Sequence, residues 1–355
     1  MLDYNELFCI EPYSLEVSAK EALLAQWLKK LGEHHEKNCG PYARLVKALG
    51  ADPALPVRLF KSHELRSIPK EDVVKTMTSS GTTGQAVSRI YLDKATSARQ
   101  SKALAQIVSA FTGKSRLPLL VIDSSAVIKN RAMFSARGAG ILGFSFLGRD
   151  VTYALDDDMQ LNLQAVKEFC ERHSDNAIML FGFTYMIWLY FIQALRERNE
   201  QLNINGVLIH GGGWKKLQDQ QVSNDSFKQI VHETTGITRI HNYYGMVEQT
   251  GSIYMECECG HLHVSELSDI QIVNPLTLEI NNNVEKSSLA GNRGLIRCTS
   301  LLPTSYPGHI LLTEDVGEIL GVDDCPCGRK GKYFAVYGRL EGAEVRGCSD
   351  THERR

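Results

Sequence analysis

The sequence predicts an α/β fold in which layered α/β subdomains are combined with an antiparallel β subdomain. Through the first two thirds of the chain, short apolar runs bounded by turn residues alternate with segments of helical apolar spacing, as in a layered α/β domain. Beyond about residue 250 the apolar runs become shorter and follow one another between turns, as antiparallel strands do. The 355 residues, 43% of them hydrophobic, are enough to enclose a sizeable core.

Individual elements follow from these patterns. Helices, marked by apolar residues at intervals of three and four, are expected at 16–36, 93–112, 161–173, 184–199 and 224–235. Buried parallel strands, marked by short apolar runs, are expected at 117–122, 177–181 and 206–210. Strands of the β subdomain are expected at 252–256, 262–266, 269–273, 294–299 and 309–313. The polar stretch at 280–294 is interpreted as an exposed loop.

Charge, cysteine content and the N-terminus limit the classes of protein. The formal net charge of −2 gives no bulk electrostatic reason to bind nucleic acid or an acidic membrane surface. The N-terminus lacks the basic and apolar regions of a signal peptide, and no run long enough to span a membrane occurs. Nine cysteines, an odd number in a long chain, do not suggest a disulfide framework. We therefore expect a cytoplasmic protein without a membrane span or a nucleic-acid partner.

The sharpest local signal is a run rich in hydroxyl groups and glycine. It comprises Thr78, Ser79, Ser80, Gly81, Thr82, Thr83, Gly84 and Gln85. The glycines let the backbone turn tightly, while the hydroxyl and backbone N–H groups can converge on phosphate oxygens. The run lacks the lysine and the following Ser or Thr of the nucleotide-binding P-loop. Taken alone it is also typical of a flexible surface loop, so its interpretation depends on partners elsewhere.

Three further motifs follow in chain order: Tyr244-Gly245-Met246-Val247-Glu248, Thr313-Glu314-Asp315 and Gly338-Arg339-Leu340-Glu341. Together the four motifs resemble the core motifs of the adenylate-forming superfamily, which includes acyl-CoA synthetases, adenylation domains and luciferases. With the tail Val345-Arg346-Gly347-Cys348-Ser349-Asp350, the whole chain most resembles the acyl-protein synthetases of bacterial bioluminescence, also called long-chain-fatty-acid protein ligases. Phenylacetate-CoA ligases are near relatives that share the stretch Cys-Pro-Cys-Gly-Arg.

This resemblance implies an enzyme of the acid–thiol ligase class. A fatty acid and ATP would give acyl-AMP and pyrophosphate, the acyl group would pass to an enzyme cysteine, and a fatty-acid reductase would receive it. Activation makes chemical sense because acyl-AMP has a phosphate leaving group, whereas a free carboxylate would have to expel oxide. Preorganised donors and Mg²⁺ stabilise the charge that develops on the phosphate oxygens. The expected cofactors are therefore ATP and Mg²⁺.

By the superfamily pattern, the loop from Ser79 to Thr83 holds the β- and γ-phosphates, with Thr83 near the reacting phosphates. Glu248 ligates Mg²⁺, while Asp315 accepts hydrogen bonds from the ribose hydroxyls and Arg339 braces ribose or phosphate. The alternatives are a solvated loop carboxylate for Glu248, a turn residue for Asp315 and a surface ion pair for Arg339.

The same pattern places Tyr244 and the turn Gly211-Gly212-Gly213 around the adenine, although the three glycines also fit a plain β-to-α turn. One departure from the superfamily is the lysine that often follows the phosphate loop, which is absent from Gln85-Ala86-Val87-Ser88. Phosphate contacts are therefore expected to come from hydroxyl and backbone groups.

A larger departure lies at the C-terminus. Superfamily ligases continue past the Gly-Arg hinge into a mobile domain with a catalytic lysine, whereas this chain stops sixteen residues after Arg339. We expect an adenylate-forming domain over residues 1–338, with its β subdomain at about 250–335, and a short mobile tail over 339–355. By resemblance, Cys348 in this tail is the catalytic thiol, and Arg346 and His352 favour its ionisation. The alternative is a disordered tail with an incidental cysteine.

Two Cys-x-Cys-Gly pairs form a second constellation: Cys257-Glu258-Cys259-Gly260 and Cys325-Pro326-Cys327-Gly328. The four cysteines could close a tetrahedral structural Zn²⁺ site, although Cys-x-x-Cys is the usual spacing. His261 and His263 are alternative ligands, and a metal-free cluster of reduced thiols or a redox role are alternative interpretations. A zinc ion with four protein ligands has no open position for catalysis.

Other functions remain open at this stage. A conventional CoA ligase, or an enzyme that loads a carrier protein, would use the same chemistry with another acyl acceptor. A zinc-containing subunit that binds nucleotide only to regulate a reductase is a non-enzymatic alternative. The aromatic residues Phe181, Phe183, Tyr185 and Trp188 fit either an acyl pocket or an ordinary core.

Overall fold

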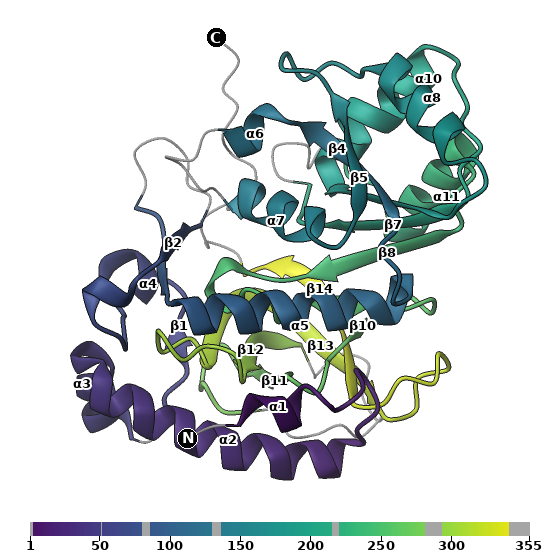
Figure 1. The fold of residues 1–355 in the computed structure, drawn as a ribbon. Helices are drawn as coiled ribbons and strands as arrows, with labels where there is room; N and C mark the ends of the chain where they lie inside the picture. Colours follow the sequence, from purple (N-terminus) through teal and green to yellow (C-terminus); the bar gives the residue numbers. More distant parts are fainter. Residues whose placement is uncertain are drawn as a thin grey trace. The chain divides into compact units, whose positions relative to one another are not determined.

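The computed structural model describes residues 3–50, 52–79, 86–129, 136–214, 220–280 and 293–340, which form two compact units (Figure 1). Among these residues, the first unit takes 3–79, 86–107 and 245–340, and the second takes 108–244. The N-terminal helices therefore share a unit with the C-terminal strands, so this unit is discontinuous in the sequence.

The second unit contains a parallel sheet with the strand order β5-β4-β6-β7-β8. The bounds are β4 (Pro118–Ser124), β5 (Arg149–Leu155), β6 (Ile178–Phe183), β7 (Gly206–Gly211) and β8 (Arg239–Tyr244). Every residue of β4 and β6 is buried, which explains their continuous apolar runs. The three predicted parallel strands are confirmed. β5 and β8 were missed because exposed or polar residues interrupt their patterns.

Helices accompany this sheet, and Figure 1 shows α8, α10 and α11 on one side of it and α7 on the other. The bounds are α6 (Ala126–Lys129), α7 (Ala136–Ser145), α8 (Leu163–Arg172), α9 (Thr184–Met186), η2 (Ile187–Ile192), α10 (Gln193–Glu197) and α11 (Asn224–Thr235). Side chains of Asn162 and Ser223 cap α8 and α11. The predicted helix at 184–199 is observed as α9, η2 and α10, with η2 in the wider π conformation.

The first unit is built on strands in the order β11-β12-β13-β14-β10-β9, each described pair antiparallel. The bounds are β9 (Tyr254–Glu256), β10 (Leu262–His263), β11 (Ser268–Val273), β12 (Gly294–Ser300), β13 (Ile310–Val322) and β14 (Lys332–Arg339). The short strand β1 (Leu55–Pro56) runs parallel to β13, and β2 (Lys75–Thr78) pairs with β3 (Arg89–Leu92) as a separate hairpin. The predicted antiparallel region is thus confirmed.

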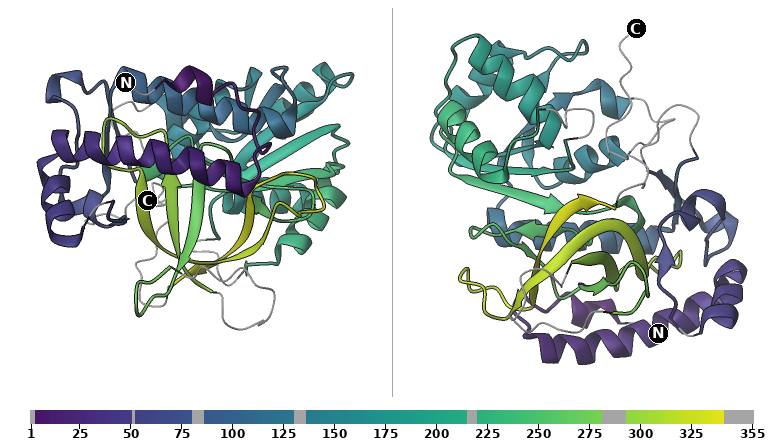
Figure 2. Two further views of the ribbon diagram at one scale, coloured as in Figure 1. Left: turned by 90° about the horizontal axis from the view of Figure 1, so that it is seen from below. Right: turned by 180° about the vertical axis from the view of Figure 1, so that it is seen from behind.

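Helices cover these strands, as Figure 2 shows for the long purple helix α2 that crosses the green to yellow strands. The bounds are α1 (Tyr4–Leu7), α2 (Val17–Asn38), α3 (Gly40–Leu49), α4 (Leu59–Ser62), η1 (Lys70–Asp72), α5 (Lys94–Thr112) and η4 (Val247–Gln249). Leu24, Trp27 and Leu31 of α2 pack in one buried cluster with Leu301 and Leu302. Burial of such side chains contributes about 1.5–3 kcal/mol each. Within the described part of the chain, no helix is both long and apolar enough to cross a membrane.

Candidate active site

The predicted phosphate loop connects the two strands of the β2–β3 hairpin. Thr78 pairs with Arg89 at the end of the hairpin. Just beyond it, Ser79 Oγ accepts a hydrogen bond of 2.9 Å from the Ser88 backbone N–H, and the Ser79 N–H donates to the Ser88 carbonyl over 3.2 Å. These bonds hold the two ends of the loop together. The other predicted loop residues, Ser80, Gly81, Thr82, Thr83, Gly84 and Gln85, lie outside the described residues.

Glu248 lies on η4, three residues after Gly245 of the same motif. Its exposed fraction is only 5%, which does not fit a solvated loop carboxylate. The Tyr306 hydroxyl donates to the Glu248 carbonyl over 2.9 Å, and Gln249 Nε2 donates to the Gly308 carbonyl over 2.9 Å. These contacts hold the turn that carries Glu248. A carboxylate oxygen is the kind of donor that Mg²⁺ prefers, so this residue fits the ion.

Asp315 and Arg339 occupy paired positions on the neighbouring strands β13 and β14. The Arg339 Nε lies 3.6 Å from Asp315 Oδ1, and the Arg339 Nη1 lies 3.8 Å from Glu314 Oε2. Arg58 donates from Nε to the same Glu314 carboxylate. The structure thus brings together the two residues predicted for ribose and phosphate contacts. Arg58 was missed because it lies far away in the sequence.

In the second unit, the predicted adenine residues lie at the carboxyl ends of β7 and β8, the edge where parallel sheets bind ligands. A Cβ on Gly211 would come within 2.4–2.8 Å of Tyr243 ring atoms, so a larger residue here would require the Tyr243 ring to move. Gly212 has a φ of +78°, a conformation that favours glycine. A Cβ on Gly213 would meet no atom within 4 Å. Tyr244 is half-buried at the end of β8.

A buried ion pair at the same edge of this sheet was missed in the sequence. Asp123, near the end of β4, accepts hydrogen bonds from Nε of Arg137 over 2.8 Å and from Nη2 of the same arginine, and both side chains are 1% exposed. The pair joins β4 to α7. A signal was present, because Asp123 is a carboxylate that directly follows a buried apolar run at the carboxyl end of a parallel strand.

The aromatic residues considered for an acyl pocket are largely core residues. Phe181 stacks on Phe144 with ring centroids 3.9 Å apart, and the ring centroids of Phe181 and Phe183 are 5.9 Å apart. Both Phe181 and Phe183 are buried, as is Trp188, which contacts Trp214 edge to face. Tyr185 is half-buried.

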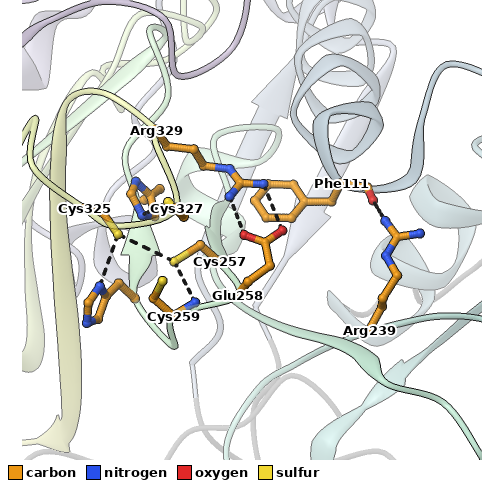
Figure 3. Close-up of polar contacts among 10 residues, drawn as sticks. Phe111, Arg239, Cys257, Glu258, Cys259, Cys325, Cys327 and Arg329 are labelled. Carbon is orange, nitrogen blue, oxygen red and sulfur yellow. Dashed lines mark hydrogen bonds and ion pairs between the residues drawn. The ribbon is translucent and has the colours of Figure 1, made fainter.

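The structure gathers the cysteines in the first unit (Figure 3). The Cys257 and Cys325 Sγ atoms are 3.9 Å apart, and Cys327 Sγ lies 3.4 Å from His263 Nε2. Donor atoms of these four residues all lie within 4.8 Å of one another, so the group could hold a metal ion. The predicted ligand Cys259 is not among the four and is exposed. We call Cys257, His263, Cys325 and Cys327 the Cys/His cluster.

The electrostatic environment differs among the thiols of the Cys/His cluster. Burial raises the pKa of the Cys257 and Cys325 thiols. Burial also acts on Cys327, but hydrogen bonds from the backbone and side chain of Arg329 bring the pKa of this thiol below its usual value. Arg329 itself is oriented by Glu258, with N···O distances of 2.6 and 3.3 Å.

Solved structures of known proteins identify the fold class. A 2-hydroxyisobutyryl-CoA ligase in a postadenylation state, in complex with R3-HIB-AMP, matches with a TM-score of 0.66 and 15% identity over 92% of this chain and 69% of that one. An open conformation of the same ligase with 2-HIB-AMP and CoA also matches with a TM-score of 0.66 and 15% identity, over 91% and 75%. The fold is that of the adenylate-forming ligases.

Sequence comparison specifies the family. The model of the acyl-protein synthetase family, LuxE, matches residues 7–355, so the chain belongs to this family. Two relatives are named long-chain-fatty-acid–luciferin-component ligase. The one from Aliivibrio fischeri is 24% identical over 84% of this chain and 76% of its own length. The one from Vibrio harveyi is 22% identical over 97% and 90%. The chain is therefore a ligase, and both the predicted family and the predicted fold class are confirmed.

Proposed function

We propose that this acyl-protein synthetase activates a fatty acid with ATP and transfers the acyl group to its own Cys348 thiol, for delivery to a fatty-acid reductase. The family match over residues 7–355 carries the proposal. The names of the two relatives, which specify long-chain fatty acids, support the substrate class. The acceptor cysteine and the reductase rest on the resemblance of the tail and on chemical reasoning.

In the first step, the fatty-acid carboxylate oxygen attacks the α-phosphorus of ATP. The new O–P bond forms as the bond to pyrophosphate breaks, and the products are acyl-AMP and pyrophosphate. The hydroxyl groups from Ser79 to Thr83 hold the departing phosphates. Hydrogen bonds between Ser79 and Ser88 fix the two ends of this loop. Such preorganised donors stabilise the charge that develops in the transition state.

The nucleotide itself is held by residues from several motifs. Asp315 accepts hydrogen bonds from the ribose, and Arg339, oriented by Asp315 and Glu314, contacts ribose or phosphate. Tyr244 and the glycine turn 211–213 contact the adenine. Mg²⁺, held by Glu248, would neutralise part of the phosphate charge.

In the second step, the Cys348 thiolate attacks the acyl carbonyl carbon. A C–S bond forms, the C–O bond to AMP breaks, and AMP leaves with its phosphate charge. A cysteine suits this step because its thiolate is a strong nucleophile that forms near neutral pH. The reductase would then take the acyl group from the thioester. The cytoplasm is the proposed location, because Cys348 must stay reduced and the cysteines that the structure describes are all free.

A second metal ion, a structural Zn²⁺ bound between the two Cys-x-Cys-Gly pairs, completes the proposed set of cofactors. It takes no part in the reaction, because four protein donors leave no open coordination position.

The acceptor is tested by incubating the protein with ATP, Mg²⁺ and a radiolabelled long-chain fatty acid, followed by denaturing electrophoresis. Wild-type protein should retain label that neutral hydroxylamine releases, as expected of a thioester. Cys348→Ser should lose at least about nine tenths of this label, because a serine hydroxyl without a general base cannot replace the thiolate. It should keep acid-dependent ATP–pyrophosphate exchange, which needs only the nucleotide and acid sites.

The matched control is Cys9→Ser, which removes another exposed cysteine and should leave the label unchanged. If Cys348→Ser is labelled as well as the wild type, the acceptor assignment is wrong. If free CoA is instead the efficient acceptor, the protein is a CoA ligase.

A further inference from the structure

The Cys/His cluster joins two tight turns of similar geometry. In the first turn, the Gly260 N–H donates to the Cys257 carbonyl over 3.0 Å, and Gly260 has a φ of +80°. In the second, the Gly328 N–H donates to the Cys325 carbonyl over 2.9 Å, with a φ of +82° at Gly328. Positive φ values favour glycine. The Cys-x-Cys-Gly pattern therefore has a local structural reason, since each glycine allows its turn to present a cysteine to the cluster.

Two donor separations in the cluster match tetrahedral coordination of one ion, and all four donor atoms lie within 4.8 Å of one another. Zn–S bonds of about 2.3 Å and a Zn–N bond of about 2.0 Å require S···S distances of about 3.8 Å and S···N distances of about 3.5 Å. The observed values are 3.9 Å between Cys257 and Cys325 Sγ, and 3.4 Å between Cys327 Sγ and His263 Nε2. The Sγ atoms of Cys257 and Cys325 are too far apart for a disulfide bond, whose length is about 2.0 Å.

His263 supplies an independent observation. Its side chain is fully buried on β10. Its Nε2 faces only the Cys327 sulfur, a weak hydrogen-bond partner. A buried imidazole without a good partner is unfavourable, and coordination of a metal ion by Nε2 would satisfy that nitrogen.

Cys259 and His261 differ from the four cluster residues. Cys259 is exposed, and its backbone N–H donates to Cys257 Sγ over 3.3 Å. Figure 3 shows this contact beside the one between Cys257 and Cys325. His261 Nδ1 lies 3.3 Å from Cys325 Sγ, and the His261 ring stacks on Tyr333. Both residues contact a cluster sulfur from outside, as the hydrogen-bonding groups around a metal ligand do.

We infer that Cys257, Cys325, Cys327 and His263 bind one structural zinc ion, with Cys259 outside the coordination sphere. Three thiolates and one imidazole are the soft donors that zinc prefers, and they exclude Mg²⁺ or Ca²⁺ as the occupant. The inference refines the proposed zinc assignment by naming its ligands. Its test counts metal and ligands without measuring acyl transfer, so it can fail independently of the proposed enzymatic function.

The zinc ion would also order the N-terminal segment of the first unit. The loop after Cys327 holds that segment through the Lys330 N–H, which donates to the Tyr13 carbonyl over 2.9 Å. Asp323, before the second turn, accepts from the Val17 N–H over 3.0 Å at the start of α2. Fixing this loop therefore fixes the point where α2 begins.

Metal analysis of purified full-length protein and its variants tests the ligand set. Elemental mass spectrometry should find about one zinc per wild-type chain. Cys257→Ser, Cys325→Ser and His263→Ala should retain less than a tenth of this amount, whereas Cys259→Ser and His261→Ala should retain nearly all of it. Cys259→Ser is the matched control, because it makes the same chemical change in the same Cys-x-Cys-Gly turn. Equal loss of zinc in Cys259→Ser and Cys257→Ser would overturn the assignment.

A measurement on the wild type covers variants that fail to fold. X-ray absorption at the zinc edge should give three sulfur neighbours and one nitrogen neighbour. Four sulfur neighbours would show that Cys259, and not His263, is the fourth ligand. Wild-type protein that is folded yet free of metal, with the cluster thiols open to modification, would show that no ion is needed. Either result refutes the inference.

Discussion

At the scale of single residues, the position of Glu248 is set by residues far away in the sequence that hydrogen-bond to its backbone. Tyr306, more than fifty positions away, donates its hydroxyl to the Glu248 carbonyl. Gln100 Nε2 in turn donates to the Tyr306 hydroxyl over 3.2 Å. The carboxylate of Glu248 is therefore carried on a turn that a chain of two hydrogen bonds holds in place, which suits a group that must hold a metal ion in one position.

We expect Glu248→Gln and Thr83→Ala each to lower acid-dependent ATP–pyrophosphate exchange by about a hundredfold, the effect of losing one strong transition-state contact. The first change removes the charge that would hold Mg²⁺ while keeping the side-chain size. The second removes a hydroxyl from the phosphate loop. Glu279→Gln, at an exposed carboxylate, is the control and should keep the wild-type rate. Wild-type exchange in folded Glu248→Gln would contradict the role of Glu248.

At the scale of elements, α5 passes unusually close to the turn that follows Glu248. A Cβ on Gly251 would lie 2.6 Å from the carbonyl oxygen of Gln100 on α5 and 2.8 Å from its Cα. Gly251 also has a φ of +89°. Because the obstructing atoms are backbone, a rotamer change cannot relieve the clash. The close approach links the position of α5 to the position of η4.

Gly251→Ala should therefore lower the free energy of unfolding by about 3 kcal/mol, combining backbone strain and overpacking. The control is Gly113→Ala, where φ is +86° but an added Cβ would meet nothing within 4 Å. This control should lose only about 1 kcal/mol, the cost of the backbone conformation. Urea denaturation of the two variants measures the difference. Equal losses would show that the contact with α5 does not restrict this position.

At the scale of the whole molecule, buried histidines make stability depend on pH. His309 and His35 are both buried in the first unit, with stacked rings 4.8 Å apart. Burial lowers the pKa of His309 to about 3, and burial also lowers the pKa of His35 well below its usual value. In the unfolded chain each of these histidines binds a proton near pH 6.5, whereas in the folded chain each binds a proton only at a lower pH. The stability that depends on these two neutral histidines is thus fully present above about pH 6.5 and is lost as the pH falls toward 3.

Each such histidine should cost about 2 kcal/mol of stability at pH 5 relative to pH 7.5. His309→Gln should consequently lose about 2 kcal/mol less than the wild type over this range, as measured by urea denaturation at the two pH values. His63→Gln, at an exposed position, should behave like the wild type. An unchanged pH dependence in His309→Gln would show that this ring takes up its proton in the folded state.

The sequence by itself determined the features that depend on local pattern and on motif order. Apolar spacing was enough to predict the helices α2, α5 and α11 and the buried strands β4, β6 and β7, because these elements bury one face or both faces regularly. The four motifs in their order indicated the superfamily, and with the C-terminal tail they indicated the family, which the match over residues 7–355 confirms. The roles of the individual site residues remain predictions.

Only the tertiary structure decided which distant side chains meet. The strand β5 has exposed residues and β8 has polar ones, so neither carries a clear period. The Asp123–Arg137 pair, the contact of Arg58 with Glu314, and the grouping of His263 rather than Cys259 with the other cysteines also appear only in three dimensions. The physical reason is that local spacing fixes which face of an element is buried, whereas contacts between residues far apart in the chain depend on strand register and turn geometry.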